Sequence, residues 1–401
     1  MRNWLKFVNN NKRLLNFGFL FNFFSALGQT FFISLFVPYW IETFKITNAS
    51  FGSIYAILTI ISAFLISFFG RFIDKMPLSK FGQFIFSGLM ISVIILSQAY
   101  NLVVLMIGLF LVRLFGQGLM THTSSTGIAK YFTDQRGKAL GFTALGHPAG
   151  QFILPLLIVP FIAFSGWRNS LLYIAAAAIV LVVPSLWAIK PVAKFESKTI
   201  DTKSKTNSNN INYFKSAKFW IISANIFVVP FICTAVFLYQ YTIGQMKGWP
   251  ASWIAFSFSF FAISSAISLL FSGSVVDRYT GLKLFPLYLI PALLALLLFS
   301  ISGHKFIFPL FYALMGLSAG LGNTVKTAMQ VEIYGTDNLG KIRSYFSTLL
   351  VLSTALGPPV FGFLIDYNFS FNAIMFAFGC VVLLIIGLSF KLLGKRSNLM
   401  V

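Results

Sequence analysis

The residues best suited to chemistry in this chain are polar side chains that interrupt long apolar stretches at helical spacing. Arg113 is followed by Gln117, Thr121 and Ser124, at four, eight and eleven residues, so that all four share one helix face. Three other stretches repeat the pattern, with Asn22, Ser25 and Gln29 in one, Thr143, His147 and Gln151 in the next, and Asn323, Lys326, Thr327 and Gln330 in the last. Polar faces of this kind inside apolar helices predict a wet cavity that binds a solute.

Charge indicates which solute such a cavity would attract. None of the nine acidic residues falls inside an apolar stretch, whereas Arg113 and His147 lie near the middle of theirs. A cationic interior attracts anions. The residues expected to bind substrate are Arg113, Gln29, Gln117, His147, Gln151, Asn323 and Tyr239. If protons are coupled to binding, His147 is the natural carrier, because an unperturbed histidine titrates near neutral pH. The alternative interpretation of Arg113 and His147 is structural, as bonds to a neighbouring helix.

The apolar stretches are predicted to be membrane spans. Hydrophobic residues make up 57% of the chain and charged residues only 10%, which excludes a water-soluble globular protein. A span needs about 20 largely apolar residues. Twelve stretches qualify: Leu14–Tyr39, Phe51–Ile73, Phe81–Gln98, Leu102–Ile128, Ala139–Phe164, Ser170–Ile189, Phe219–Tyr241, Trp253–Val276, Leu284–Ile301, Phe306–Met329, Tyr345–Ile365 and Phe371–Leu393.

The net charge of +21 is distributed asymmetrically between the loops. Of the 30 Lys and Arg residues, Lys45, Arg168, Lys247 and Lys305 alone fall in loops on one side, and Arg113 and Lys326 alone fall within spans more than two residues from an end. Because basic loops stay in the cytoplasm, both termini are predicted to be cytoplasmic, with the chain in a bacterial inner (plasma) membrane. Charge placed in this way indicates contact with a lipid bilayer and excludes nucleic acid as a partner.

An internal duplication organises the chain. Gly70 and Gly273, Asp74 and Asp277, and Gly137 and Gly340 are each 203 residues apart. A repeat of this length divides the chain into two six-span halves. The polar, lysine-rich composition of residues 191–218 is typical of a flexible linker. We therefore expect an N-terminal bundle over 1–190, a cytoplasmic linker over 191–218 and a C-terminal bundle over 219–401.

The turn at Gly70–Lys80 carries a family resemblance. It reads G-R-F-I-D-K-M-P-L-S-K, and its copy at Gly273–Lys283 reads G-S-V-V-D-R-Y-T-G-L-K. Gly-x-x-x-Asp-(Arg/Lys) between the second and third spans resembles the signature loop of the major facilitator superfamily of secondary transporters. The first copy departs from that loop with Met76-Pro77 in place of x-Gly, whereas the second keeps Gly281 and Lys283.

The resemblance implies an all-α integral membrane protein, with twelve transmembrane helices in two pseudo-symmetric six-helix bundles. In that family the aspartate of the turn meets the facing half and helps to close the cytoplasmic side. The gating residues implied here are Gly70, Asp74, Lys75, Arg136, Gly273, Asp277 and Arg278. The expected cationic partners of the two aspartates are Arg71, Lys75, Arg136 and Arg278. The simpler alternative is that these charges only set the topology.

Small residues at four-residue spacing predict close helix contacts at Gly137/Gly141, Gly146/Gly150 and Gly316/Gly320. The segment Gly335–Lys341 approaches a phosphate-binding loop, but Ile342 replaces the required Ser or Thr and the segment joins two helices. No cluster of metal ligands and no catalytic triad is present in the sequence. We therefore expect no enzymatic activity, no metal and no cofactor.

Together these features predict a secondary transporter that moves a small solute by alternating access. The solute is expected to be an organic anion such as a carboxylate, coupled to protons or a counter-anion, and the protein is expected to be a monomer. Two alternatives stay open. Phenylalanine-rich spans and the Gly146–Gly150 sequence G-H-P-A-G fit efflux of amphipathic, drug-like compounds, and a non-transporting sensor could use the same scaffold.

Overall fold

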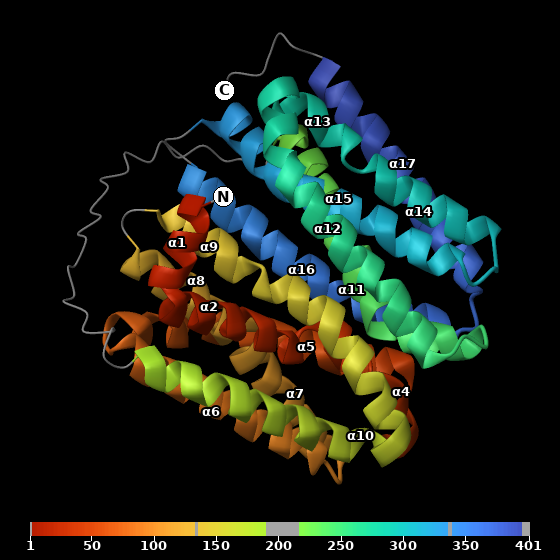
Figure 1. Ribbon diagram of the computed structural model, residues 1–401. Helices are drawn as coiled ribbons and strands as arrows, with labels where there is room; N and C mark the ends of the chain where they lie inside the picture. Colours follow the sequence, from red (N-terminus) through yellow and green to blue (C-terminus); the bar gives the residue numbers. More distant parts are fainter. Residues whose placement is uncertain (1, 133–134, 190–215, 336–338, 395–401) are drawn as a thin grey trace. The chain divides into compact units, whose positions relative to one another are not determined.

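A computed structural model describes residues 2–132, 135–189, 216–335 and 339–394 (Figure 1). Within these residues every regular element is a helix. A backbone surrounded by lipid must satisfy its hydrogen bonds internally, and a helix does so within one segment. Ten of the described helices are long and apolar enough to cross a membrane. The prediction of an all-α protein built from apolar helices is therefore confirmed.

The chain divides into two compact units. The first comprises Met1–Ile46 and Ile57–Thr199, and the second comprises Thr47–Ala56 and Ile200–Val401. The predicted linker, residues 191–218, lies almost wholly outside the described residues, so the predicted domain limits stay a prediction.

The helices from the N-terminus to residue 189 range in length from four to 44 residues. They are α1 (Arg2–Asn10), α2 (Lys12–Phe24), η1 (Ser25–Gly28), α3 (Thr30–Ile33), α4 (Val37–Phe44), α5 (Asn48–Gly70), η2 (Arg71–Asp74), α6 (Leu78–Ser97), α7 (Leu102–Val112), η3 (Arg113–Met120), α8 (Thr121–Tyr131), α9 (Arg136–Ala144) and α10 (Gly146–Ile189). Helix α5 begins in the second unit and continues into the first.

The remaining helices belong to the second unit. They are α11 (Ala217–Met246), α12 (Ala251–Tyr279), α13 (Gly281–Leu287), α14 (Ile290–Ile301), α15 (Ile307–Tyr334), α16 (Leu339–Asp366) and α17 (Phe371–Gly394). Figure 1 shows α12, α15, α14 and α17 as neighbouring rods in green to blue.

The first predicted span is not one continuous helix. It is divided into α2, the 3₁₀ turn η1, the single turn α3 and the short α4, with Gln29 in an extended conformation at φ −84° and ψ 151°. No proline lies within the break. A Cβ on Gly28 would instead collide with backbone atoms of Val112 and Gln117, so this glycine lets η1 pack directly on the backbone of η3.

The fifth and sixth predicted spans form one apolar segment, Arg136–Ile189, with a sharp break. Gly166 has φ 76° and ψ 167°, a conformation that glycine adopts readily and that ends the helix there. This segment counts once among the ten apolar helices, and the broken first span is not counted at all. The predicted total of twelve spans stays a prediction.

Buried polar side chains tie the helices of each unit together. In the first unit, Asn22 Nδ2 donates to Ser124 Oγ at 2.8 Å and to Thr143 O at 2.9 Å. In the second unit, Tyr288 donates to Asn225 Oδ1 at 2.7 Å. Hydrogen bonds between membrane helices contribute about 0.6 kcal/mol each on average and rarely more than about 2 kcal/mol. These hydrogen bonds determine which helix faces pack together, and their contribution to total stability is small.

The predicted glycine contacts are only partly correct. A Cβ on Gly316 would lie 2.6 Å from Phe261 O, and one on Gly150 would lie 2.6 Å from Phe23 O, so the close helix approach at these pairs is confirmed. The pair Gly137/Gly141 has open space instead, with nothing within 4 Å of either added Cβ. That part of the prediction is wrong, because spacing alone does not say which face of α9 meets another helix.

Candidate functional site: a buried arginine and an adjoining polar cavity

Arg113 is the first residue of the π-helix η3, and only 2% of its surface is exposed. Its Nη1 donates to Gly28 O at 3.3 Å and to Thr30 Oγ1 at 3.5 Å. Both acceptors lie at the interruption of the first span, where the extended residue Gln29 leaves carbonyl groups outside the regular helical pattern. Both acceptors are neutral, and both distances are long for an N–H···O bond.

A cavity of about 600 Å³ lies within the first unit, between α2, α5, α8 and α9. Its polar lining consists of Asn22, Thr121, His122, Ser125 and Thr143, and its apolar lining consists of Ile66, Gly118, Leu140 and Ala144. Arg113 is not part of this lining. The described walls contain one ionisable side chain, that of His122.

The π-helix explains why Arg113 and Thr121 do not face the same space. A π-helix closes i→i+5 hydrogen bonds, so it holds more residues per turn than an α-helix and shifts the residues after it around the axis. The predicted stripe of Arg113, Gln117 and Thr121 assumed an uninterrupted α-helix. In the structure Arg113 is enclosed against the first span, while Thr121 lines the cavity.

His122 is a cavity residue that was not predicted as part of the site. Its Nε2 lies 3.3 Å from Gly70 O, and its Nδ1 lies 3.4 Å from Thr126 Oγ1. A Cβ on Gly70 would come within 3.0 Å of the imidazole, so glycine at this position lets the ring reach the end of α5. In the sequence His122 is one of the few ionisable residues inside a predicted span, but it lies next to Thr121 rather than at helical spacing from Arg113.

Most of the predicted binding residues of the first unit border the interruption of the first span. Gln29 lies between Gly28 and Thr30, the two residues that Arg113 bonds. Gln117 is half-buried in η3, with its backbone against Gly28. His147 is half-buried and packs edge-on to Phe31 of α3, with ring centroids 6.3 Å apart, and Gln151 is buried one turn further along α10.

The two predicted binding residues of the second unit differ in their surroundings. Asn323 is exposed on α15, and its carbonyl oxygen accepts a bond from Thr327 Oγ1 at 3.0 Å. Tyr239 is fully buried, and its hydroxyl donates to Asn48 O at 2.7 Å. Tyr239 therefore packs against the start of α5 instead of facing an open space.

The carboxylate of Asp366 binds the same helix start. It accepts hydrogen bonds from Asn48 N at 3.1 Å, Asn48 Nδ2 at 2.9 Å and Ala49 N at 2.7 Å. The N-terminus of a helix leaves backbone N–H groups unsatisfied and carries partial positive charge, so a carboxylate stabilises it. We call Asp366, Asn48 and Tyr239 the α5 clasp.

The first signature turn uses a cation that was not expected. Asp74 forms an ion pair with Lys130, which lies at the end of α8. The predicted partners are engaged elsewhere: Arg71 lies over the ring of Phe68 at 5.3 Å, Lys75 over the ring of Phe72 at 5.8 Å, and Arg136 Nε donates to Phe132 O at 3.1 Å. The prediction of Arg71, Lys75 or Arg136 as the partner is therefore wrong, because these side chains extend along nearby aromatic or backbone groups.

The second signature turn is built differently. Asp277 and Arg278 are exposed, and Arg278 lies over the ring of Tyr279 at 5.3 Å. The acidic group that organises this turn is Glu332, at the end of α15, which accepts from Gly281 N at 2.7 Å and Leu282 N at 2.9 Å. Among the described residues no ion pair of Asp277 is found. Gly273 has nothing within 4 Å of an added Cβ, so no close contact requires a glycine there.

Long apolar helices, a polar cavity inside one unit and a buried cation define a multi-pass membrane protein of the transporter class. The chain belongs to the Major Facilitator Superfamily, whose family model matches residues 18–305 and 251–398. This finding confirms the resemblance carried by the two turns. Membership of this family makes the chain a membrane transporter. No curated protein matches the sequence. Within the described residues no group of metal ligands is found.

Solved structures share the fold at low sequence identity. The nucleoside transporter NupG matches with a TM-score of 0.73 and 16% identity, over 96% of this chain and 99% of that one. A bacterial homologue of the human lysosomal transporter Spinster, inward-facing and occupied, matches with a TM-score of 0.69 and 15% identity, over 95% and 96% of the two chains. At these identities the likeness shows the fold alone.

Proposed function

We propose that this transporter carries a small organic anion, such as a carboxylate, and that Arg113 binds its negative charge. The observation that supports the proposal is a guanidinium buried beside the interruption of the first span, bonded to Gly28 O and Thr30 Oγ1 at long distances. A carboxylate would accept two parallel, shorter hydrogen bonds from the same group. Such an anion is a stronger acceptor than the neutral groups and would compete with them for the guanidinium.

The distribution of acidic residues supports an anion over a cation. The described acidic residues, Glu42, Asp74, Asp277, Glu332 and Asp366, all lie at helix ends or in turns. A buried cation binds a positively charged solute poorly unless a carboxylate lies beside it. Gln29 and Gln117 border the same break and offer amide groups that would orient a bound carboxylate.

Two further roles belong to the proposal. His147, next to Phe31 on α3, would carry the proton if transport is proton-coupled. The residues of the two turns, Asp74 with Lys130 and Asp277 with Arg278, would close the side that we propose to be cytoplasmic, together with both termini. Uptake by His147→Gln should lose the pH dependence that wild type shows, whereas a pH profile unchanged by this substitution would exclude His147 as the carrier.

The substrate proposal is tested by transport into proteoliposomes. A panel of labelled carboxylates, nucleosides and amphipathic compounds identifies the solute, and kcat/KM is then compared between wild type, Arg113→Gln and Arg113→Lys. A charged hydrogen bond contributes about 1.5–3 kcal/mol, so Arg113→Gln should lower kcat/KM for the anion by roughly 10- to 150-fold. Arg113→Lys keeps the charge but cannot bind a carboxylate in bidentate fashion, so an intermediate loss is expected.

Arg168 offers a matched control. Its Nη2 also donates to a backbone carbonyl, that of Ala99, at 2.8 Å, but it lies in the predicted loop between the fifth and sixth spans. Arg168→Gln removes the same kind of arginine–carbonyl bond and should leave kcat/KM unchanged. If Arg113→Gln transports an anion as well as wild type does, the proposal fails. If the panel shows transport of a neutral or cationic amphipathic compound alone, the efflux alternative replaces it.

A further inference from the structure

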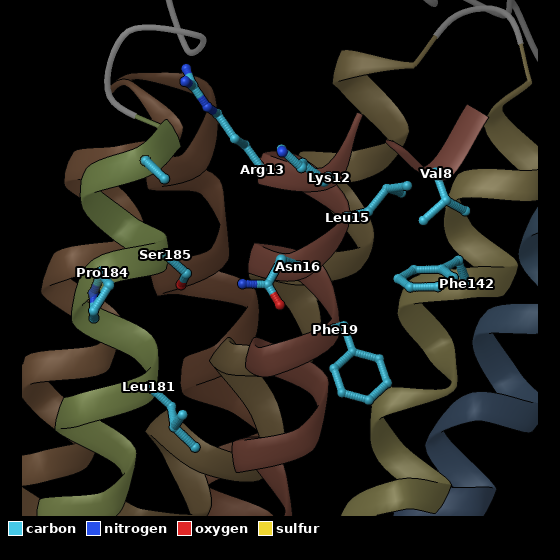
Figure 2. A pocket seen from close by; sticks show the side chains of 11 residues that line it. Val8, Lys12, Arg13, Leu15, Asn16, Phe19, Phe142, Leu181, Pro184 and Ser185 are labelled. Atoms are coloured by element: carbon cyan, nitrogen blue, oxygen red, sulfur yellow. The ribbon is translucent and has the colours of Figure 1, made fainter. Parts of the chain in front are cut away.

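A second cavity lies on another face of the first unit. Its volume is about 650 Å³, within the roughly 300–1,000 Å³ typical of small-molecule sites. It lies between the start of α2 and the last turns of α10, with α1 and α9 at its edge (Figure 2). None of its lining residues is shared with the cavity that contains His122. We call it the α2–α10 groove.

The groove has a cationic end and an apolar body. Lys12 and Arg13 stand exposed at one end, where α2 begins, and Figure 2 shows Lys12 level with the last turn of α10 and Arg13 extending past it. Further along α2 the groove is lined by Leu15 and Phe19, and on α10 by Leu181, which is 50% exposed. An apolar trough with two cations at one end complements an amphipathic molecule with an anionic head.

Asn16 is the second observation that indicates a ligand. It lies one turn along α2 from Lys12, is exposed, and extends into the groove toward α10 (Figure 2). Among the described residues no hydrogen bond of its amide is found. Opposite it, the Ser185 hydroxyl is buried and donates to Val182 O within α10. A free amide facing an apolar groove is costly in a membrane unless something polar bonds it.

We propose that the α2–α10 groove is a binding site for an anionic phospholipid. Lys12 and Arg13 hold the phosphate, Asn16 hydrogen-bonds the glycerol ester region, and the acyl chains lie over Phe19 and Leu181. At 1.5 Å per residue Asn16 lies about 6 Å deeper than Lys12, which places an amide below the phosphate level of a lipid and above its hydrocarbon. The positive-inside distribution puts this end of α2 at the cytoplasmic leaflet, where anionic lipids attract basic residues.

This proposal is independent of the transported solute. Arg113 bonds Gly28 near the middle of the first span, and Asn22 and Gly18 use the face of α2 that is buried against α8 and α9. A lipid in the groove would hold α2 against α10 without occupying the cavity of His122. Failure of one proposal therefore leaves the other intact.

Native mass spectrometry of the detergent-purified chain measures the affinity directly, with phosphatidylglycerol as the anionic probe and phosphatidylcholine as the zwitterionic one. Each basic residue near the membrane surface contributes about 1 kcal/mol. Lys12→Gln/Arg13→Gln should therefore weaken phosphatidylglycerol binding roughly 30-fold, and each single variant about 5-fold, with little effect on phosphatidylcholine. Lys80→Gln/Lys138→Gln, at two exposed basic residues outside the groove, is the matched control and should bind like wild type.

Asn16→Leu distinguishes lipid binding in the α2–α10 groove from nonspecific attraction of anionic lipid to a basic surface. Because the glycerol ester region is common to both lipids, this variant should weaken both roughly 2- to 10-fold and leave the preference for phosphatidylglycerol unchanged. Equal losses in the groove variants and the Lys80/Lys138 control would show a diffuse electrostatic effect and overturn the proposal. It is likewise overturned if Asn16→Leu binds both lipids as tightly as wild type. The single variants give the answer if the double variant does not fold.

Discussion

The geometry of the α5 clasp allows the loss of stability caused by a substitution at Asp366 to be predicted. In Asp366→Asn the side chain keeps one acceptor oxygen, but an amide N–H₂ group then faces backbone N–H groups of Asn48 and Ala49. The helix start also loses the negative charge that complements its dipole. Because these groups are exposed to solvent, the loss is expected at about 1 kcal/mol instead of the several kcal/mol of a buried charge.

The segment that should respond is Thr47–Ala56, the part of α5 that belongs to the second unit. A loss of about 1 kcal/mol in local opening free energy accelerates amide hydrogen exchange roughly 5-fold. Exchange is measured by mass spectrometry on peptides covering 47–56, with the protein in lipid nanodiscs. Tyr239→Phe removes the bond to Asn48 O from the other side and should accelerate the same peptides by a similar factor.

Glu42→Gln is the control for this prediction. Glu42 is an exposed acidic residue a few positions before α5, and the described residues show no hydrogen bond from its carboxylate to that helix. Its substitution should leave exchange of 47–56 unchanged. The reasoning is refuted if Asp366→Asn exchanges at the wild-type rate, or if Glu42→Gln accelerates the segment as much as Asp366→Asn does.

Two further predictions concern the first unit. Gly28→Ala places a Cβ against the backbone at Gln117, so it should lower the free energy of unfolding by about 1–3 kcal/mol and lower the melting temperature. Gly137→Ala, whose Cβ enters open space, is the control and should leave the melting temperature unchanged. Equal melting temperatures for the two variants would contradict the close contact at Gly28. In a double-mutant cycle, Lys130→Gln and Asp74→Asn should show a coupling below about 1 kcal/mol, because the two side chains are 38% and 61% exposed. A coupling above about 2 kcal/mol would show that the pair acts as a buried one.

The sequence predicted most helices to within a few residues, because hydropathy and length are local properties. Helix α6 begins three residues before the predicted span and ends one residue short of it, and α17 begins at the predicted residue and ends one residue beyond the predicted end. Gly146 and Gly150 were expected to allow close contact, and each would collide with the backbone of α2 if it carried a Cβ. Helix limits follow from local composition, whereas glycine spacing is correct at this pair and wrong at Gly137/Gly141, because it does not identify the partner helix.

What the sequence did not predict depends on contacts between segments that are distant in the chain. The interruption of the first span and the π-helix of the fourth contact each other at Gly28, and no proline lies in residues 25–36 or 113–120 that would indicate a break there. The π-helix in turn moved Thr121 to a face different from that of Arg113. The pairing of Asp74 with Lys130 required the position of α8 relative to the turn, which periodicity does not give.

Helix α5 is uninterrupted over 23 residues, about 34 Å, and polar contacts hold both of its ends. It begins at the carboxylate of Asp366 and ends where Gly70 meets His122, just before Asp74 pairs with Lys130. Because both contacts belong to one continuous helix, a substitution that frees the start of α5 is expected to change the dynamics of its end at Gly70 as well.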